Sequence, residues 1–127
     1  MIFDIKLSEN FRRKARYVAG GHKTKPPAAV TYSSVVSRDS VRIALLLAGL
    51  NELDILCGDI QNAYLTAPNK EKVYCIAGPE FGSDQGKPML ITRALYGLKS
   101  AGAAFRSFLA ITLDDMSFKP SHADPGV

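Results

Sequence analysis

The distribution of apolar residues restricts this chain to a mixture of helices and strands. In residues 38–50 and 101–115, apolar side chains recur every three or four positions, the spacing that places them on one face of a helix. Three shorter apolar runs, at residues 53–58, 73–76 and 89–92, are bounded by turn-forming residues and have the length of strands. The sequence therefore predicts an α+β fold.

Each predicted helix has a start and a face expected to be buried. Ser37 or Asp39 can cap the first helix, since a short polar side chain accepts hydrogen bonds from its free amides, and the helix runs to about Leu50. The second helix runs from Ala101 to about Asp115. The residues expected to face the core are Val41, Ala44, Leu45 and Ala48 in the first helix, and Ala104, Phe105, Phe108, Leu109, Thr112 and Leu113 in the second.

Two strand predictions bear on function. Residues 12–19 alternate loosely, which places Lys14 and Arg16 on the same face of a strand. Residues 53–58 are predicted to form a buried strand that ends at Asp59. A carboxylate would then stand at the end of a buried element.

Size and composition indicate one globular domain. The chain has 127 residues, 46% hydrophobic and 22% charged. No run approaches the roughly 18 apolar residues that a membrane-spanning helix needs, and the N-terminus lacks the pattern of a signal peptide. An intracellular protein without membrane contact is therefore expected. Cys57 and Cys75 lie in apolar runs and are expected to be buried, reduced thiols rather than zinc ligands.

Positive charge is concentrated near the N-terminus. Seven basic residues against two acidic ones give residues 1–25 a net charge of +5, so the rest of this +4 chain sums to −1. A basic arm suits a polyanion such as nucleic acid or a triphosphate, and a solvated charged face is the alternative. The basic residues of the arm are Lys6, Arg12, Arg13, Lys14, Arg16, Lys23 and Lys25.

Residues 58–65, Gly-Asp-Ile-Gln-Asn-Ala-Tyr-Leu, are the segment best suited to chemistry. Asp59 can hold a divalent cation beside a backbone carbonyl, and the amides of a tight turn after it can bind phosphate. Tyr64 is placed to form a floor beneath a sugar. From these residues alone two other interpretations stay open: Asp59 as a capping side chain and Tyr64 as a core aromatic.

Further motifs run along nearly the whole chain. Residues 14–21, Lys-Ala-Arg-Tyr-Val-Ala-Gly-Gly, resemble KARLVAKG, and residues 31–38 together with 40–44 resemble TFAPV…R…IR. Residues 58–65 contain the Asp, small turn, Ala and aromatic residue of motif A, and residues 93–99, Arg-Ala-Leu-Tyr-Gly-Leu-Lys, are nearly identical to ALYGLKQ. In this order the segments resemble the reverse transcriptase of copia-type (Ty1/copia) retrotransposons.

This resemblance implies a fold and an activity. The fold would be a partial right-hand polymerase, fingers plus the first part of the palm, with a mixed or antiparallel sheet and packed helices. About 1–33 and 68–94 would be fingers, and about 34–67 and 95–127 would be palm. The activity would be RNA-directed DNA synthesis within a retrotransposon Pol polyprotein.

The resemblance also implies roles for individual residues. Asp59 would be the catalytic ligand of the first metal, with the carbonyl of Ile60 beside it. The backbone amides of Asn62 and Ala63 would bind the incoming triphosphate, and Tyr64 would be the steric gate against a ribose 2′-hydroxyl. The remaining nucleotide-binding residues would be Lys14 and Arg16, on the phosphates, and Tyr96, Gly97 and Lys99, on the nucleotide and template side of motif B.

The sequence departs from this family in ways that bear on activity. Two metals, Mg²⁺ in the complete enzyme, need more than one carboxylate, and the family's further carboxylates come from a Tyr-x-Asp-Asp hairpin. The only Asp-Asp pair here, Asp114-Asp115, has Thr112 rather than Tyr two positions before it and lies at a predicted helix end. Ser100 and Gly102 replace the usual Gln and Pro of motif B. The chain is therefore expected to be inactive by itself.

Partners and location follow from the same resemblance. The complete enzyme would act on an RNA or DNA template-primer and deoxynucleoside triphosphates, beside integrase and RNase H regions, in cytoplasmic virus-like particles and in the nucleus. Two alternatives remain: a non-catalytic remnant that binds nucleic acid through its basic N-terminal arm, and a poorly folded remnant with an exposed sheet edge.

Overall fold

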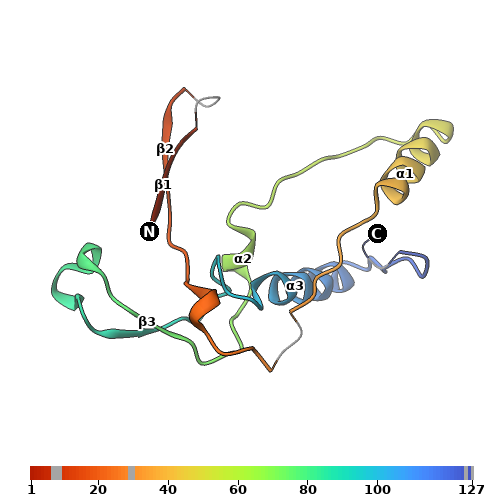
Figure 1. Ribbon diagram of the computed structural model, residues 1–127. Coiled ribbons are helices and arrows are strands. Elements are labelled where there is room, and N and C mark those ends of the chain that lie inside the picture. The colour runs from red at the N-terminus through yellow and green to blue at the C-terminus, as the bar shows by residue number, and fades with distance from the viewer. Residues whose placement is uncertain (7–9, 29–30, 125, 127) are drawn as a thin grey trace.

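The computed structural model describes residues 1–6, 10–28, 31–124 and 126. Helices and antiparallel strands are both present, as the sequence predicts (Figure 1). The strands are β1 (Ile2–Lys6), β2 (Arg12–Arg16), β3 (Tyr74–Ile76) and β4 (Pro88–Leu90); the helices are α1 (Arg38–Leu50), α2 (Ala63–Thr66) and α3 (Ala101–Asp115), with two 3-10 helices, η2 (Gly21–Lys23) and η3 (Pro79–Asp84).

The strands form two separate antiparallel pairs. β1 pairs with β2, which places Lys14 opposite Asp4, and β3 pairs with β4, which places Cys75 opposite Met89. β1 was not predicted, and β2 ends at Arg16 rather than continuing to residue 19. The strand ends early because the following residues bond elsewhere, as described below.

Residues 53–60 form neither a helix nor a strand, so the predicted buried strand at 53–58 is wrong. The whole segment is exposed, and Leu56 is 99% exposed. An extended segment becomes a strand only when a neighbour pairs with its backbone groups, and no strand in the described part of the chain pairs with this one. Asp59 therefore follows an open segment.

Helix α1 begins as predicted but is not buried as predicted. The Ser37 hydroxyl accepts a hydrogen bond from the amide of Ser40 at 3.0 Å, which is the expected N-cap. No residue of α1 is buried, however, and Leu45 of the predicted inward face is 50% exposed. Figure 1 shows why: α1 stands apart from α2 and α3, at the end of two extended segments, so neither of these helices covers its apolar face.

The small core lies where α2 meets the start of α3. Only the first turns of α3 face it, through Ala104 and Phe105, whereas Phe108 and Leu113 of the predicted stripe are 38% and 39% exposed. The buried residues are Ala67, Ile91, Ala94, Leu98 and Ala101, with Tyr64, Val73, Cys75 and Leu95 among the partly buried residues around them.

The chain exposes far more surface than a compact protein of its size. Its accessible surface is 10352 Å², whereas a compact protein of 13.8 kDa exposes roughly 6,600 Å². The β1–β2 hairpin, the isolated α1 and the open 53–60 segment all contribute to this exposure.

Both cysteines are free thiols, and one departs from expectation. Cys57 is exposed rather than buried, because it lies in the open segment. Cys75 is half-buried on β3, and its sulfur accepts a hydrogen bond from the Tyr17 hydroxyl at 3.7 Å. Among the described residues, no helix combines the length and apolar character needed to cross a membrane.

Candidate functional site

A tight turn follows Asp59, as the sequence predicts. Asn62 has a φ of 52° in the left-handed region, which asparagine tolerates better than most residues. The carbonyl of Asn62 accepts a hydrogen bond from Leu65 at 2.8 Å, and Ala63 is the first residue of α2. The amide of Ala63 therefore belongs to a helix start, where amides have no acceptor within the helix. Asp59 and Ile60 are exposed immediately before this turn.

Tyr64 connects the turn to the core. It is half-buried, and its ring lies 5.0 Å from that of Tyr96, measured between centroids, with 43° between the planes. Its ring also lies 6.0 Å from that of Phe105, at 60°. We call Tyr64, Tyr96 and Phe105 the aromatic cluster. Tyr64 is thus a core-edge aromatic, and its half-exposed side remains accessible from solvent.

The turn before α3 fits closely against the segment after β2. The amide of Ala19 donates to the carbonyl of Tyr96 at 2.7 Å, which is why β2 stops short. Gly97 has a φ of 89°, and a Cβ there would stand 2.1 Å from the Ala19 carbonyl oxygen. A Cβ on Gly21 would stand 1.9 Å from the Gly97 carbonyl oxygen. Both positions require glycine, and two of the predicted motifs are therefore in direct contact.

Lys99 also joins the turn before α3 to the segment after β2. Its Nζ donates to the backbone carbonyl of Thr24 at 3.0 Å, so the amine holds the loop that follows Gly21. The structure therefore brings Tyr64, Tyr96, Gly97 and Lys99 into one region with residues 19–24.

Lys14 and Arg16 lie elsewhere. They share one face of β2, with Arg16 exposed and Lys14 half-buried, and their cross-strand neighbours are Asp4 and Ile2. Figure 1 shows the β1–β2 hairpin extending away from α2 and α3. The structure therefore does not place these two cations over the turn that follows Asp59.

The described residues do not fit a complete divalent-metal site. No group of three or more His, Cys, Asp or Glu side chains that could hold a metal is present among them. Two metal ions need more than one carboxylate from the protein, and Asp59 offers one. Asp114 binds the Lys119 amine instead, and Asp115 is exposed at the end of α3.

Asp124 has a structural role that the sequence did not reveal. Its Oδ2 accepts hydrogen bonds from the Ser40 hydroxyl at 2.5 Å and the Ser37 amide at 3.1 Å, and its Oδ1 accepts from the Gly126 amide at 2.9 Å. These bonds, above all that from Ser40, lower the pKa of Asp124 to about 2. The carboxylate therefore ties the end of the chain to the start of α1.

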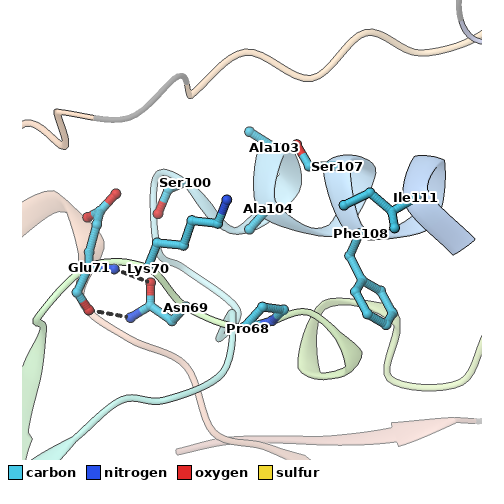
Figure 2. Close-up of a pocket in the computed structure, with 10 residues that line it drawn as sticks. All are labelled: Pro68, Asn69, Lys70, Glu71, Ser100, Ala103, Ala104, Ser107, Phe108 and Ile111. Atoms are coloured by element: carbon cyan, nitrogen blue, oxygen red, sulfur yellow. Dashed lines mark hydrogen bonds between the residues drawn. The ribbon is translucent and has the colours of Figure 1, made fainter.

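A groove that is not part of the candidate site runs along α3 (Figure 2). Its volume is about 290 Å³, and the Oε1 atom of Glu71 at its edge is buried without a hydrogen-bond partner. None of the predicted site residues lines it, so it lies outside the candidate site. The lining residues are Pro68, Asn69, Lys70, Glu71, Ser100, Ala103, Ala104, Ser107, Phe108 and Ile111.

Comparison with known proteins decides the family. The family model described as "Reverse transcriptase (RNA-dependent DNA polymerase)" matches residues 2–127. This chain belongs to that family. The resemblance to copia-type reverse transcriptases is thus confirmed, and the chain corresponds to part of the RNA-directed DNA polymerase region of a retrotransposon Pol polyprotein.

Individual relatives agree with the family match. The chain is 35% identical over 118 residues to the retrovirus-related Pol polyprotein from transposon RE2 of Arabidopsis thaliana, and equally to that from transposon RE1. These alignments cover 89% of this chain and 8% of each polyprotein. The Transposon Ty1-BL Gag-Pol polyprotein of Saccharomyces cerevisiae is 36% identical over 95 residues, 71% of this chain and 5% of that protein. The chain thus spans less than a tenth of these relatives. No solved structure matches it.

Proposed function

We propose that this chain supplies the fingers and the first part of the palm of an RNA-directed DNA polymerase. About 1–33 and 68–94 form the fingers part, and about 34–67 and 95–127 form the palm part. The contact between Tyr64 and Tyr96 carries the proposal, because it joins the two segments that resemble motif A and motif B, with ring centroids 5.0 Å apart. Two motifs can bind the same nucleotide only when they lie next to each other in the fold.

In this proposal the turn after Asp59 binds a deoxynucleoside triphosphate. The amides of Asn62 and Ala63 donate to its phosphates, and Tyr64 leaves no room for a 2′-hydroxyl. Tyr96 and Gly97 lie on the nucleotide and template side. These residues bind and orient the substrate, which is the main contribution a protein makes to phosphoryl transfer.

Three cations complete the binding of nucleotide and template-primer. Lys14 and Arg16 reach the triphosphate only if the β1–β2 hairpin folds over the turn, since it extends away from α2 (Figure 1). Lys99 exchanges its bond to the Thr24 carbonyl for one to the nucleotide or template. Binding of either substrate should therefore move the hairpin and the 19–24 loop.

Asp59, beside the Ile60 carbonyl, is proposed as the carboxylate that this chain contributes to a metal site. Mg²⁺ is the favoured ion because it prefers carboxylate oxygens. The other ligands come from outside the described residues, since these hold no further carboxylate group able to complete the site. The 127 residues by themselves should therefore not extend a primer, and magnesium-dependent extension by the purified chain would contradict this.

The test of the proposed function is made in a related retrotransposon polymerase whose matching segment is replaced by this chain. Asp59→Asn should abolish deoxynucleotide incorporation in a primer-extension assay. Asp54→Asn is the matched control, because Asp54 is an exposed acid in the same open segment and has no proposed role. Equal activity of the two variants would overturn the assignment of Asp59.

The gate is tested in the same polymerase. Tyr64→Ala should mainly relax discrimination against ribonucleotides, because removing the ring opens space for the 2′-hydroxyl, while deoxynucleotide incorporation persists. Unchanged sugar selectivity would show that Tyr64 is a core aromatic only.

A second candidate function is non-catalytic binding of nucleic acid by the basic hairpin. The observation that favours it is the largely exposed β2, Arg12–Arg16, on a hairpin that extends away from the core (Figure 1). The chain would then act inside the cell, in virus-like particles or the nucleus, beside integrase and RNase H regions of the same polyprotein.

Fluorescence anisotropy with a labelled primer-template tests this candidate. Replacing Lys14 and Arg16 together by Ala should weaken binding and reduce the slope of log affinity against log salt by about 2. Lys70 and Lys72, which are exposed away from the hairpin, provide the control double substitution. Absence of binding by the unmodified chain at low salt removes the candidate.

A further inference from the structure

The position of the Tyr64 ring depends on its neighbours rather than on its own helix. α2 has only four residues, far fewer than a helix needs to persist by itself. It is entered through the left-handed Asn62 and left at Ala67, whose amide donates to the Tyr64 carbonyl at 3.1 Å. Only the backbone of this turn is fixed by these bonds. Tyr64 packs against the buried core, and its ring contacts the rings of the other two members of the aromatic cluster.

Phe105 is the member of this cluster on a rigid support. It stands one turn into the 15-residue α3, four residues after the buried Ala101, which is 2% exposed. The groove along α3 is lined by Ala104 and Phe108 but not by Phe105. Phe105 contacts Tyr64 instead, at 6.0 Å between ring centroids.

We propose that Phe105 is a positioning residue that sets sugar selectivity by holding the Tyr64 ring in place. The inference rests on the proposed function, because it takes Tyr64 as the gate. A gate rejects a 2′-hydroxyl by overlap, and overlap persists only while the ring cannot move aside. Tyr96 also contacts the ring but belongs to the nucleotide side, so Phe105 is the support that need not touch the nucleotide.

The test compares ATP and dATP, which differ only in the 2′-hydroxyl, as ligands of the purified chain in one magnesium-containing buffer. Tyrosine fluorescence reports binding, since the chain has five Tyr and no Trp. Phe105→Leu should lower the ratio of the two dissociation constants, ATP over dATP, about two- to tenfold, the range expected for loss of one aromatic pair. The dATP affinity itself should change little.

Three further variants separate positioning from general packing. Phe105→Tyr keeps the ring and should keep the ratio. Phe108→Leu is the matched control, because Phe108 is on the same helix but lines the groove instead, and it should also keep the ratio. Phe105→Met preserves most of the volume without the ring, and it replaces Phe105→Leu if thermal unfolding shows that the leucine variant does not fold.

The outcomes distinguish a failure of the positioning role of Phe105 from a failure of the gate role of Tyr64. If Tyr64→Ala lowers the ratio and the ring-deleting Phe105 variants do not, the gate stands and the positioning role of Phe105 is overturned. If Tyr64→Ala leaves the ratio unchanged, or the unmodified chain binds neither nucleotide, the gate fails in this chain and this inference fails with it, whereas the polymerase assignment is decided by the primer-extension test of Asp59. An equal fall in the ratio for Phe108→Leu would also overturn it, because packing in general would then be the cause.

Discussion

The backbones of Gly21 and Gly97 lie against each other in the candidate site. A methyl group on Gly21 would overlap the Gly97 carbonyl oxygen, 1.9 Å away, and backbone atoms cannot move aside cheaply. Gly21→Ala should therefore destabilise the fold by about 1–3 kcal/mol, the usual cost of overpacking, measured by urea unfolding. Gly49→Ala in α1 is the control: nothing lies within 4 Å of its Cβ position, and the change should be neutral or slightly stabilising. Equal effects would show that the Gly21 contact does not form.

Asp124 gives a prediction about pH. Its pKa, about 2, lies below its ordinary value of 3.8, so its bonds stabilise the folded state fully above the ordinary value. That contribution is lost as the pH falls through the folded-state pKa. The amide resonances of Ser37 and Gly126 should accordingly shift together with a midpoint near pH 2, and Asp124→Asn should remove the transition. Asp84→Asn, an acid paired with Lys87, should leave it unchanged. A midpoint near 4 in the unmodified chain contradicts the contact.

These residues also show what sequence patterns predict at this scale. The Ser37 cap was predictable because its partner, Ser40, is three positions away and the capping chemistry is local. The bond from Ser40 to Asp124 spans 84 positions, and the contact of Gly21 with Gly97 is similarly distant. Secondary-structure propensities describe local structure and carry no information about partners so far apart in the sequence. The family motif at residues 93–99 marked Gly97 as a position of interest but did not reveal its partner.

At the scale of elements, the sequence predicted well where α1 and α3 begin and end, but not which of their apolar residues are buried. α1 and α3 occupy residues 38–50 and 101–115, as expected from periodicity and capping. The strand at 53–58 fails because a strand, unlike a helix, draws its hydrogen bonds from another segment. The predicted burial of the apolar face of α1 is wrong for a related reason. An apolar stripe shows which face of a helix can be buried, but not whether another element covers it.

The Ser37 cap makes α1 testable as an element. Ser37→Ala removes the side-chain acceptor for the Ser40 amide but keeps the backbone amide of residue 37 that donates to Asp124. Helix content measured by circular dichroism should fall, with a cost of about 1 kcal/mol for the lost cap. Ser107→Ala on the exposed side of α3 is the control, since it removes no cap and alanine favours helix. A larger loss at Ser107 would contradict the capping role.

At the scale of the whole molecule, a leucine-to-alanine substitution should have a large effect on stability in the small core and almost none in the open 53–60 segment. Leu98→Ala opens a cavity in the core, where Leu98 is 8% exposed, and should cost about 2–5 kcal/mol of unfolding free energy. Leu56→Ala, at a residue 99% exposed, should change that energy by about 0.5 kcal/mol or less. Urea unfolding of both variants measures the difference. A large loss at Leu56 would mean that the segment before Asp59 packs after all, as the buried strand expected from its apolar sequence, and Asp59 would then stand on a rigid element rather than an open one.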